Sequence, residues 1–226
     1  MKNRASLYSY ADGSKFKGKR GADIFKEIYQ NANWNLTHQE SVSGEGSDRI
    51  QTATLIKQLP RLLQELGVKT ILDIPCGDFF WMQQVALEDI KYWGGDIVPE
   101  LIMHNQQQYG SAEREFMLLD LMHDPLPKAD LIFCRDCLVH LSLADIQLAL
   151  ENIKRTEASW LLTTHFPEEA ANKDIDTGGW RPLNFCLPPF DFSPPKLLIN
   201  EGCSEMNGAF QDKSMALWNV AQIEHL

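Results

Sequence analysis

The strongest constraint in the sequence is an alternation of strand-like and helix-like segments between residues 70 and 164. Short apolar runs that suit buried strands are predicted at 70–74, 91–96, 115–119, 130–134 and 159–164. Helical patterns are predicted between them at 79–87, 99–108 and 142–155. Strands joined by helical crossovers form a mostly parallel sheet with helices on both faces. We therefore expect a doubly wound, Rossmann-like α/β domain.

The flanking sequence divides the chain into an extension and a main domain. Residues 1–49 are predicted to be an N-terminal extension with a short helix at 23–32 and a glycine-containing loop, SVSGEGS, at 41–47. The main domain, 50–226, begins with a helix at 50–66, in which Pro60 predicts a kink or a break. It ends with strands at 196–200 and 214–220, which suit an antiparallel hairpin.

Residues 167–195 have a different composition, with six prolines, adjacent glycines and four aromatic residues. Long connections of this kind in compact domains are usually functional or disordered. Because the aromatic residues argue against disorder, we expect an ordered lid.

Charge and cysteine content exclude several classes of function. The formal net charge of −10 disfavours binding to nucleic acid, whose affinity for proteins comes largely from phosphate contacts. No apolar run reaches the length of a membrane-spanning helix, and the N-terminus lacks the apolar region of a signal peptide. Five cysteines, an odd number, predict reduced thiols and a cytoplasmic location. Cys134 and Cys137 have CxxC spacing, which leaves a redox role open. A zinc site needs a second ligand pair, so no metal is expected.

Acidic residues follow successive predicted strands at the carboxyl end of each one. They are Asp73 and Asp78, Asp96, Asp120, and Asp136, which follows Arg135. Each acid alone has an ordinary explanation as a helix cap or turn residue. Four strand ends in series point instead to one crevice, where α/β sheets bind ligands. Carboxylates suit a ligand with hydroxyl and amino donors and would repel a bare phosphate.

The turn after the first strand, DIPCGDFF, differs from phosphate-binding turns. A dinucleotide fingerprint, GxGxxG, places a pyrophosphate on backbone N–H groups at a helix N-terminus. This turn has one glycine, and Asp78 lies where a phosphate would approach. Nicotinamide and flavin dinucleotides are therefore disfavoured, and a Walker A loop is absent from the sequence.

These motifs, in this order, resemble the class I S-adenosylmethionine (SAM)-dependent methyltransferases. LDIPCGDF is similar to the LDxGCGxG motif, GGDIVPELI to the motif that holds the ribose hydroxyls, and Asp120-Leu121 to the motif near the adenine amino group. ADLIFCRDCLVHLS resembles the strand and loop that end in a histidine, here His140. The likeness covers roughly residues 50–165. The flanks SVSGEGS, TGGWRPLN and LINEGCSE resemble a bacterial branch suspected of acting on glycans or other small molecules.

The resemblance implies a fold and a cofactor site. The fold would be a sheet of about seven strands in the order 3-2-1-4-5-7-6, with strand 7 antiparallel. The residues implied to bind SAM are Asp73, Pro75, Cys76, Gly77, Asp78, Trp81, Asp96, Ile97, Asp120, Leu121 and Arg135. Two departures stand out: Pro75 replaces a glycine and has no N–H, and Phe79 replaces another and adds bulk. A cofactor site retained only for packing remains an alternative.

Three residues are candidates for catalysis and three for binding an acceptor. An oxygen acceptor often needs a general base, which His140 or His165 would supply, with Asp136 orienting the base or binding the cofactor ammonium. Arg135 is expected to bind an acidic group of the acceptor or to pair with Asp136. Trp180, Arg181 and Asn184 in the expected lid would suit a sugar ring or a flat small molecule.

Three functions remain open from the sequence. The first is O-methylation of a small molecule or glycan. The second is methylation of nitrogen or sulfur, or of a protein side chain, for which a base matters less. The third is a non-catalytic SAM-binding or interaction protein. The protein is expected to be a monomer or a homodimer.

Overall fold

The computed structural model describes residues 12–31 and 40–223. Seven strands and five α-helices are assigned in the described residues. The strands are β1 Thr70–Asp73, β2 Lys91–Asp96, β3 Arg114–Leu118, β4 Leu131–Cys134, β5 Trp160–His165, β6 Leu197–Asn200 and β7 Ser214–Asn219. The helices are α1 Gly21–Gln30, α2 Arg49–Glu65, α3 Pro99–Tyr109, α4 Leu143–Arg155 and α5 Glu205–Gly208.

The strands form one sheet in the order β3-β2-β1-β4-β5-β7-β6. The first five strands are parallel, and β7 is antiparallel to both β5 and β6. The order and the direction of β7 confirm the fold expected from the resemblance. Because β6 runs parallel to β5, the carboxyl ends of β1 to β6 all lie at one edge of the sheet.

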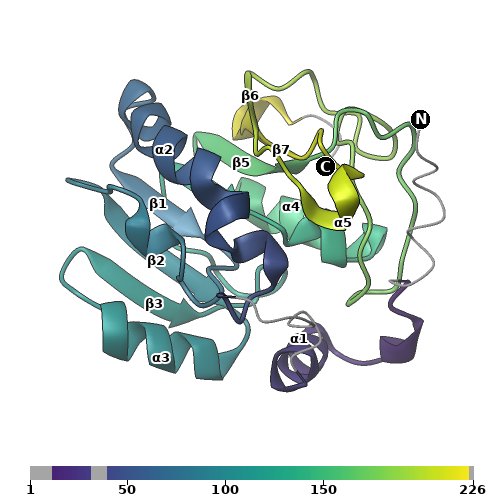
Figure 1. Ribbon diagram of the computed structural model, residues 1–226, viewed down its shortest axis with the longest axis horizontal. Helices are drawn as coiled ribbons and strands as arrows, with labels where there is room; N and C mark the ends of the chain where they lie inside the picture. Colours follow the sequence, from purple (N-terminus) through teal and green to yellow (C-terminus); the bar gives the residue numbers. More distant parts are fainter. Residues whose placement is uncertain (1–11, 32–39, 224–226) are drawn as a thin grey trace.

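Alternate residues of the central strands supply two hydrophobic layers, as expected for a sheet buried on both faces. Ile71 and Leu131 pack against Leu55, Leu59 and Leu63 of α2. On the opposite face, neighbours of these strand residues pack against α4, whose buried residues are Ile146, Ala149, Leu150 and Ile153. Figure 1 shows α2 on one side of the sheet and α4 on the other.

Two predictions about helices are corrected. Residues 79–87 form only a short 3-10 turn, Met82–Gln84, since the backbone is left-handed at Phe79, with φ of 58°, and extended at Val85, with ψ of 126°. Helix α2 is not broken at Pro60, which lies inside its assigned range. Ser142 caps the N-terminus of α4, since its hydroxyl accepts a hydrogen bond from the backbone N–H of Asp145.

Residues 167–195, expected from the sequence to form an ordered lid, contribute several aromatic side chains to the core. Phe185, Phe190 and Phe192 are buried with Trp218 of β7 in one aromatic cluster. The Phe166 N–H donates to the Leu183 carbonyl at 2.8 Å, which pins the segment beside the end of β5. The segment therefore forms a fixed wall beside the carboxyl ends of the strands.

Candidate functional site

An inner cavity of about 140 Å³ lies where the carboxyl ends of β1, β2 and β4 meet. The acids at three predicted strand ends, Asp73, Asp96 and Asp120, all line it. Other cofactor-site candidates share the lining: Pro75, Cys76, Gly77, Asp78, Trp81, Ile97, Leu121 and Arg135. The structure therefore brings together all eleven residues implied by the resemblance.

The turn after β1 is fixed by Asp96 at the end of β2. One carboxylate oxygen of Asp96 accepts the Gly77 N–H at 3.1 Å, and the other accepts the Val98 N–H at 2.9 Å. Burial raises the pKa of Asp96 to about 6, while these backbone donors favour its ionised form. Asp120 is held in a similar way, with its carboxylate accepting the Met122 N–H at 2.9 Å.

The Phe79 ring leaves the inner cavity open, contrary to the concern that its bulk would fill the site. The left-handed backbone directs the ring, which is 1% exposed, into a cluster with Tyr92, Tyr109 and Phe116. The ring does not line the cavity. Gly77, with φ of 55°, keeps the neighbouring backbone free of a side chain.

Asp73 is buried at the end of β1 and accepts a hydrogen bond of 2.6 Å from the Tyr92 hydroxyl. Burial raises the pKa of Asp73 to about 8, although the Tyr92 hydrogen bond works in the opposite direction. At neutral pH the folded protein therefore holds a proton on Asp73, which an unfolded chain releases near pH 4.

The raised pKa of Asp73 predicts that its contribution to stability falls as the pH rises. Between about pH 4 and pH 8 Asp73 keeps its proton in the folded state and loses it in the unfolded state, so its contribution to the free energy of unfolding decreases across this interval. Asparagine does not titrate. We therefore expect Asp73→Asn to remove a decrease in the free energy of unfolding of up to about 1.4 kcal/mol per pH unit. Urea unfolding of both proteins at pH 5, 6, 7 and 8 measures the difference. If the free energy of unfolding changed with pH to the same extent in both proteins, the raised pKa of Asp73 would be contradicted.

A strap formed by residues 40–47 lies across the Gly77 turn. The Asp78 carboxylate accepts the Ser41 hydroxyl and the Val42 N–H, both at 2.8 Å. The Asp78 N–H donates in turn to the Ser43 hydroxyl at 2.9 Å. The resemblance implied that Asp78 binds SAM, and in the structure one of its carboxylate oxygens holds the strap. Val42, Ser43 and Ser47 line the inner cavity, so the strap forms part of its wall.

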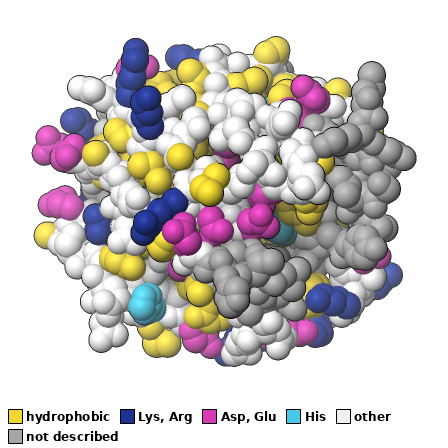
Figure 2. Space-filling model, in the orientation of Figure 1, with side chains coloured by type: hydrophobic (Ala, Val, Ile, Leu, Met, Phe, Trp, Pro, Cys, Tyr) yellow, Lys and Arg dark blue, Asp and Glu magenta, His cyan; other side chains and the backbone are white. Residues whose placement is uncertain are grey.

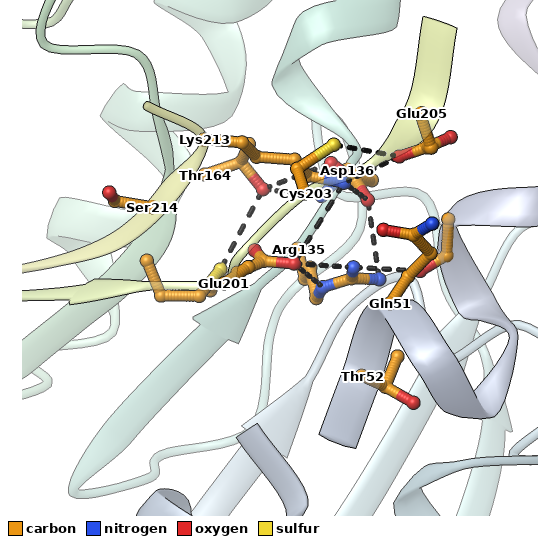
Figure 3. Close-up of polar contacts among 12 residues, drawn as sticks. Gln51, Thr52, Arg135, Asp136, Thr164, Glu201, Cys203, Glu205, Lys213 and Ser214 are labelled. Atoms are coloured by element: carbon orange, nitrogen blue, oxygen red, sulfur yellow. Dashed lines mark hydrogen bonds and ion pairs between the residues drawn. The ribbon is translucent and has the colours of Figure 1, made fainter. Parts of the chain in front are cut away.

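An ionic cluster is buried beside the strap (Figure 3). The Arg135 guanidinium pairs with Glu201 at 2.6 Å and Asp136 at 3.2 Å, and donates to the Gly46 carbonyl at 2.8 Å. Burial disfavours the charged form, but Glu201 and Asp136 raise the pKa of Arg135 above its ordinary value. Of the two roles considered for Arg135, pairing with Asp136 is the one that the structure contains.

Lys213, just before β7, completes the ionic cluster. Its ammonium lies 2.6 Å from the Asp136 carboxylate and 3.6 Å from that of Glu205. Although burial opposes ionisation of Asp136, Lys213 and Arg135 hold the pKa of Asp136 well below its usual value. Sequence reasoning did not identify Lys213, Glu201 or Glu205 as site residues.

A second, outer cavity of about 750 Å³ adjoins the inner one. The residues that line both cavities are Ile28, Ser43, Ser47, Asp136 and His140. The His140 ring is fixed by a contact of 2.7 Å between Nδ1 and the Gly179 carbonyl. Burial lowers the pKa of His140 below its ordinary value, so the ring is neutral at pH 7. A neutral imidazole beside a fixed carboxylate is a suitable arrangement for accepting a proton.

Of the three candidate acceptor residues, Trp180 alone lines the outer cavity. The Trp180 ring packs against Phe166 and Phe210. Arg181 is 1% exposed and donates to the carbonyls of Leu138, Leu141 and Lys173, so it serves the fold.

Asn184 and His165 lie outside both cavities. The Asn184 amide bonds the carbonyls of Pro167 and Glu169. His165 accepts the Phe185 N–H at 3.2 Å, and burial lowers its pKa to about 4. We therefore do not assign His165, Arg181 or Asn184 a role in binding or catalysis.

The protein surface is consistent with the acidic composition. Figure 2 shows acidic side chains in a row across the middle of one face, near the start of α2. Within residues 12–31 and 40–223, no helix combines the length and apolar character needed to cross a membrane.

The fold matches those of several solved methyltransferases. Human N-acetylserotonin methyltransferase in complex with SAM superposes with a TM-score of 0.61 at 15% identity, over 96% of this chain and 64% of that one. PigF with S-adenosylhomocysteine (SAH) superposes with a TM-score of 0.53 at 16% identity, over 79% of this chain and 58% of that one. Magnesium protoporphyrin IX methyltransferase from Synechocystis PCC 6803 with bound SAM superposes with a TM-score of 0.52 at 17% identity, over 70% of this chain and 82% of that one.

These matches establish the fold and show that this chain spans less than two thirds of the length of the human enzyme. No protein-family model matches the sequence, and no curated protein matches it. The chain has the Rossmann-like fold of SAM-dependent methyltransferases.

Proposed function

We propose that this protein is a SAM-dependent methyltransferase that acts on a small molecule or glycan, most readily at oxygen. The observation that carries the proposal is the convergence of Asp73, Asp96 and Asp120 on one cavity, at the edge of a methyltransferase fold. The printed names of three structural neighbours describe methyltransferases with bound SAM or SAH, which supports the same cofactor here.

The inner cavity has the chemistry that SAM requires. Asp96 and Asp120 offer carboxylate oxygens for hydroxyl and amino donors, and Ile97, Val98 and Leu121 offer apolar surface for a flat ring. The Gly77 backbone carries no side chain where it faces Ser43 of the strap. When bound, the cofactor supplies an activated methyl group, and the protein must align the acceptor and exclude water.

We infer that the acceptor enters through the outer cavity and meets the cofactor site at Asp136 and His140. His140 would take the proton from an acceptor hydroxyl, and Asp136, kept ionised by Lys213, would hold a donor group of the acceptor. Trp180 gives the outer cavity an aromatic wall suited to a sugar ring or a flat molecule.

Replacing His140 tests the proposed base. Once an acceptor has been found by screening for SAH release, we expect His140→Ala to lower kcat by about 100-fold or more while SAH affinity stays within about twofold. The native enzyme should keep its activity below pH 6.5, because burial lowers the pKa of His140. His104→Ala, at an exposed position of α3, is the control and should leave both quantities unchanged.

The outcome also separates the alternatives. Unchanged turnover in His140→Ala would favour a nitrogen or sulfur acceptor, which needs less help in deprotonation. Tight SAM binding with no methyl transfer to any acceptor would favour a non-catalytic SAM-binding protein.

A further inference from the structure

We propose that Arg135 and Glu201 form a latch that holds the strap, residues 40–47, closed over the inner cavity. Arg135 and Glu201 would then be positioning residues, and the C-terminal hairpin β6–β7 would control entry and release of the ligand. That the ligand is SAM or SAH rests on the proposed function, whereas closure of the strap does not.

The strap is attached to the domain at two separated points. Near its start, Ser41 and Val42 are bound by the Asp78 carboxylate. Near its end, the Gly46 carbonyl accepts a hydrogen bond from Arg135. Ser43, between these points, lies so close to Gly77 that a Cβ atom on that glycine would be 2.4 Å from the Ser43 hydroxyl.

The attachment at Gly46 depends on a residue far away in the sequence. Glu201 follows β6, and its carboxylate contacts Arg135 at Nε and at a terminal nitrogen, at 3.2 and 2.6 Å. This two-point contact, drawn in Figure 3, fixes the plane of the guanidinium. One terminal nitrogen bonds both the Glu201 carboxylate and the Gly46 carbonyl. Both charged side chains are at most 4% exposed, so water does not compete for them.

The start of α2, shortly after the strap, is also hydrogen-bonded to the segment that follows β6. Gln51, in the first turn of α2, donates to the Ser204 hydroxyl at 2.8 Å and accepts the Ser204 N–H at 3.2 Å. The end of the strap and the start of α2 are therefore both tied to the segment that follows β6.

Closure of the strap has a consequence for ligand exchange. The inner cavity, at about 140 Å³, is smaller than the roughly 300–1,000 Å³ typical of small-molecule sites. Its wall on one side is the strap. A cofactor-sized ligand therefore requires the strap to move, and the strength of the latch sets how often this happens.

Limited digestion with a protease that cleaves after glutamate tests the latch without any ligand. Glu45 is an exposed residue of the strap, and Glu113, exposed before β3, is an internal reference in the same digest. We expect Glu201→Gln, which removes the charge without changing shape, to accelerate cleavage after Glu45 about tenfold relative to cleavage after Glu113.

Two further variants make this result specific. Glu205→Gln removes a carboxylate of the same cluster that bonds Lys213 and Cys203, and it should leave cleavage after Glu45 unchanged. If Glu201→Gln does not fold, Glu201→Asp retains the buried charge and withdraws the carboxylate by one methylene, with the same expected acceleration. Equal acceleration at Glu45 and Glu113 would show general loosening and would overturn the latch, as would unchanged cleavage after Glu45.

Release of SAH then tests the functional consequence. In stopped-flow dissociation, Glu201→Gln should release SAH about tenfold faster than the native protein and Glu205→Gln. Unchanged release in a variant with a freed strap would overturn control of exchange by the hairpin. If the native protein does not bind SAH while digestion behaves as expected, the proposed function fails and the latch stands.

Discussion

Replacing Gly77 with alanine is expected to lower the affinity for SAM and SAH by about tenfold or more. Gly77 has a positive φ of 55°, and a Cβ there would lie 2.4 Å from the Ser43 hydroxyl and 3.1 Å from its Cβ. The left-handed conformation alone costs a non-glycine residue about 1–2 kcal/mol. The contact with Ser43 adds a second effect, because relieving it displaces the strap that forms one wall of the inner cavity. Isothermal titration calorimetry measures the affinity, and urea unfolding measures the stability.

Gly67→Ala is the matched control for this prediction. Gly67 follows α2 with a positive φ of 67°, but a Cβ there meets nothing within 4 Å. We expect it to cost stability through backbone strain and to leave SAH affinity unchanged. Equal SAH affinity in the Gly77 and Gly67 variants would contradict the assignment of the Gly77 turn to the cofactor site.

Replacing Arg135 with methionine is expected to lower the free energy of unfolding by about 3–5 kcal/mol. The substitution leaves the Glu201 carboxylate, 1% exposed, with Lys213 at 3.9 Å as its remaining ionic neighbour. It also removes the donor to the Gly46 carbonyl. Because a buried charge without its partner is costly, the loss should be far larger than for a surface ion pair. Urea unfolding at pH 7 measures it.

Arg61→Met supplies the comparison. Arg61 pairs with Glu65 one turn along α2, and its side chain is 83% exposed. Exposed pairs of this kind contribute about 0–1 kcal/mol. A loss for Arg135→Met no larger than that for Arg61→Met would mean that the buried cluster does not stabilise the fold.

The sheet and the inner cavity were predictable because they depend on repeated, local signals. Apolar strand runs alternated with helical patterns, and acids followed each strand end, so Asp73, Asp96 and Asp120 were placed correctly at one edge of the sheet. The strand order came from the resemblance and is confirmed.

The helix predicted at 79–87 failed because tertiary packing overrode the local pattern. Phe79, Trp81, Met82 and Val85 are buried, but they reach the core from an irregular segment. Arg181 and Asn184, predicted to bind an acceptor, donate hydrogen bonds to carbonyls of the surrounding loops. The sequence alone does not distinguish a polar side chain that binds a ligand from one that supports a loop.

Glu201 and Lys213 were not identified from the sequence. Both nevertheless lie at strand ends on the same edge of the sheet, which becomes clear once the directions of the strands are known. Strand β6 runs parallel to β1–β5, so the acid that follows it, Glu201, reaches the same edge of the sheet. Strand β7 is antiparallel, so the residue that reaches this edge is the one before the strand, Lys213. A search restricted to residues after strands therefore overlooks the cation of the cluster.

The most direct test of the account is calorimetric titration of the native protein and Asp96→Ala with SAM and with SAH. Asp96 both lines the inner cavity and fixes the Gly77 turn, so the account predicts micromolar binding by the native protein and its loss in the variant. Circular dichroism would confirm that the variant is folded. Absence of binding by the native protein would contradict the proposed cofactor, and the methyltransferase likeness would then describe only the fold.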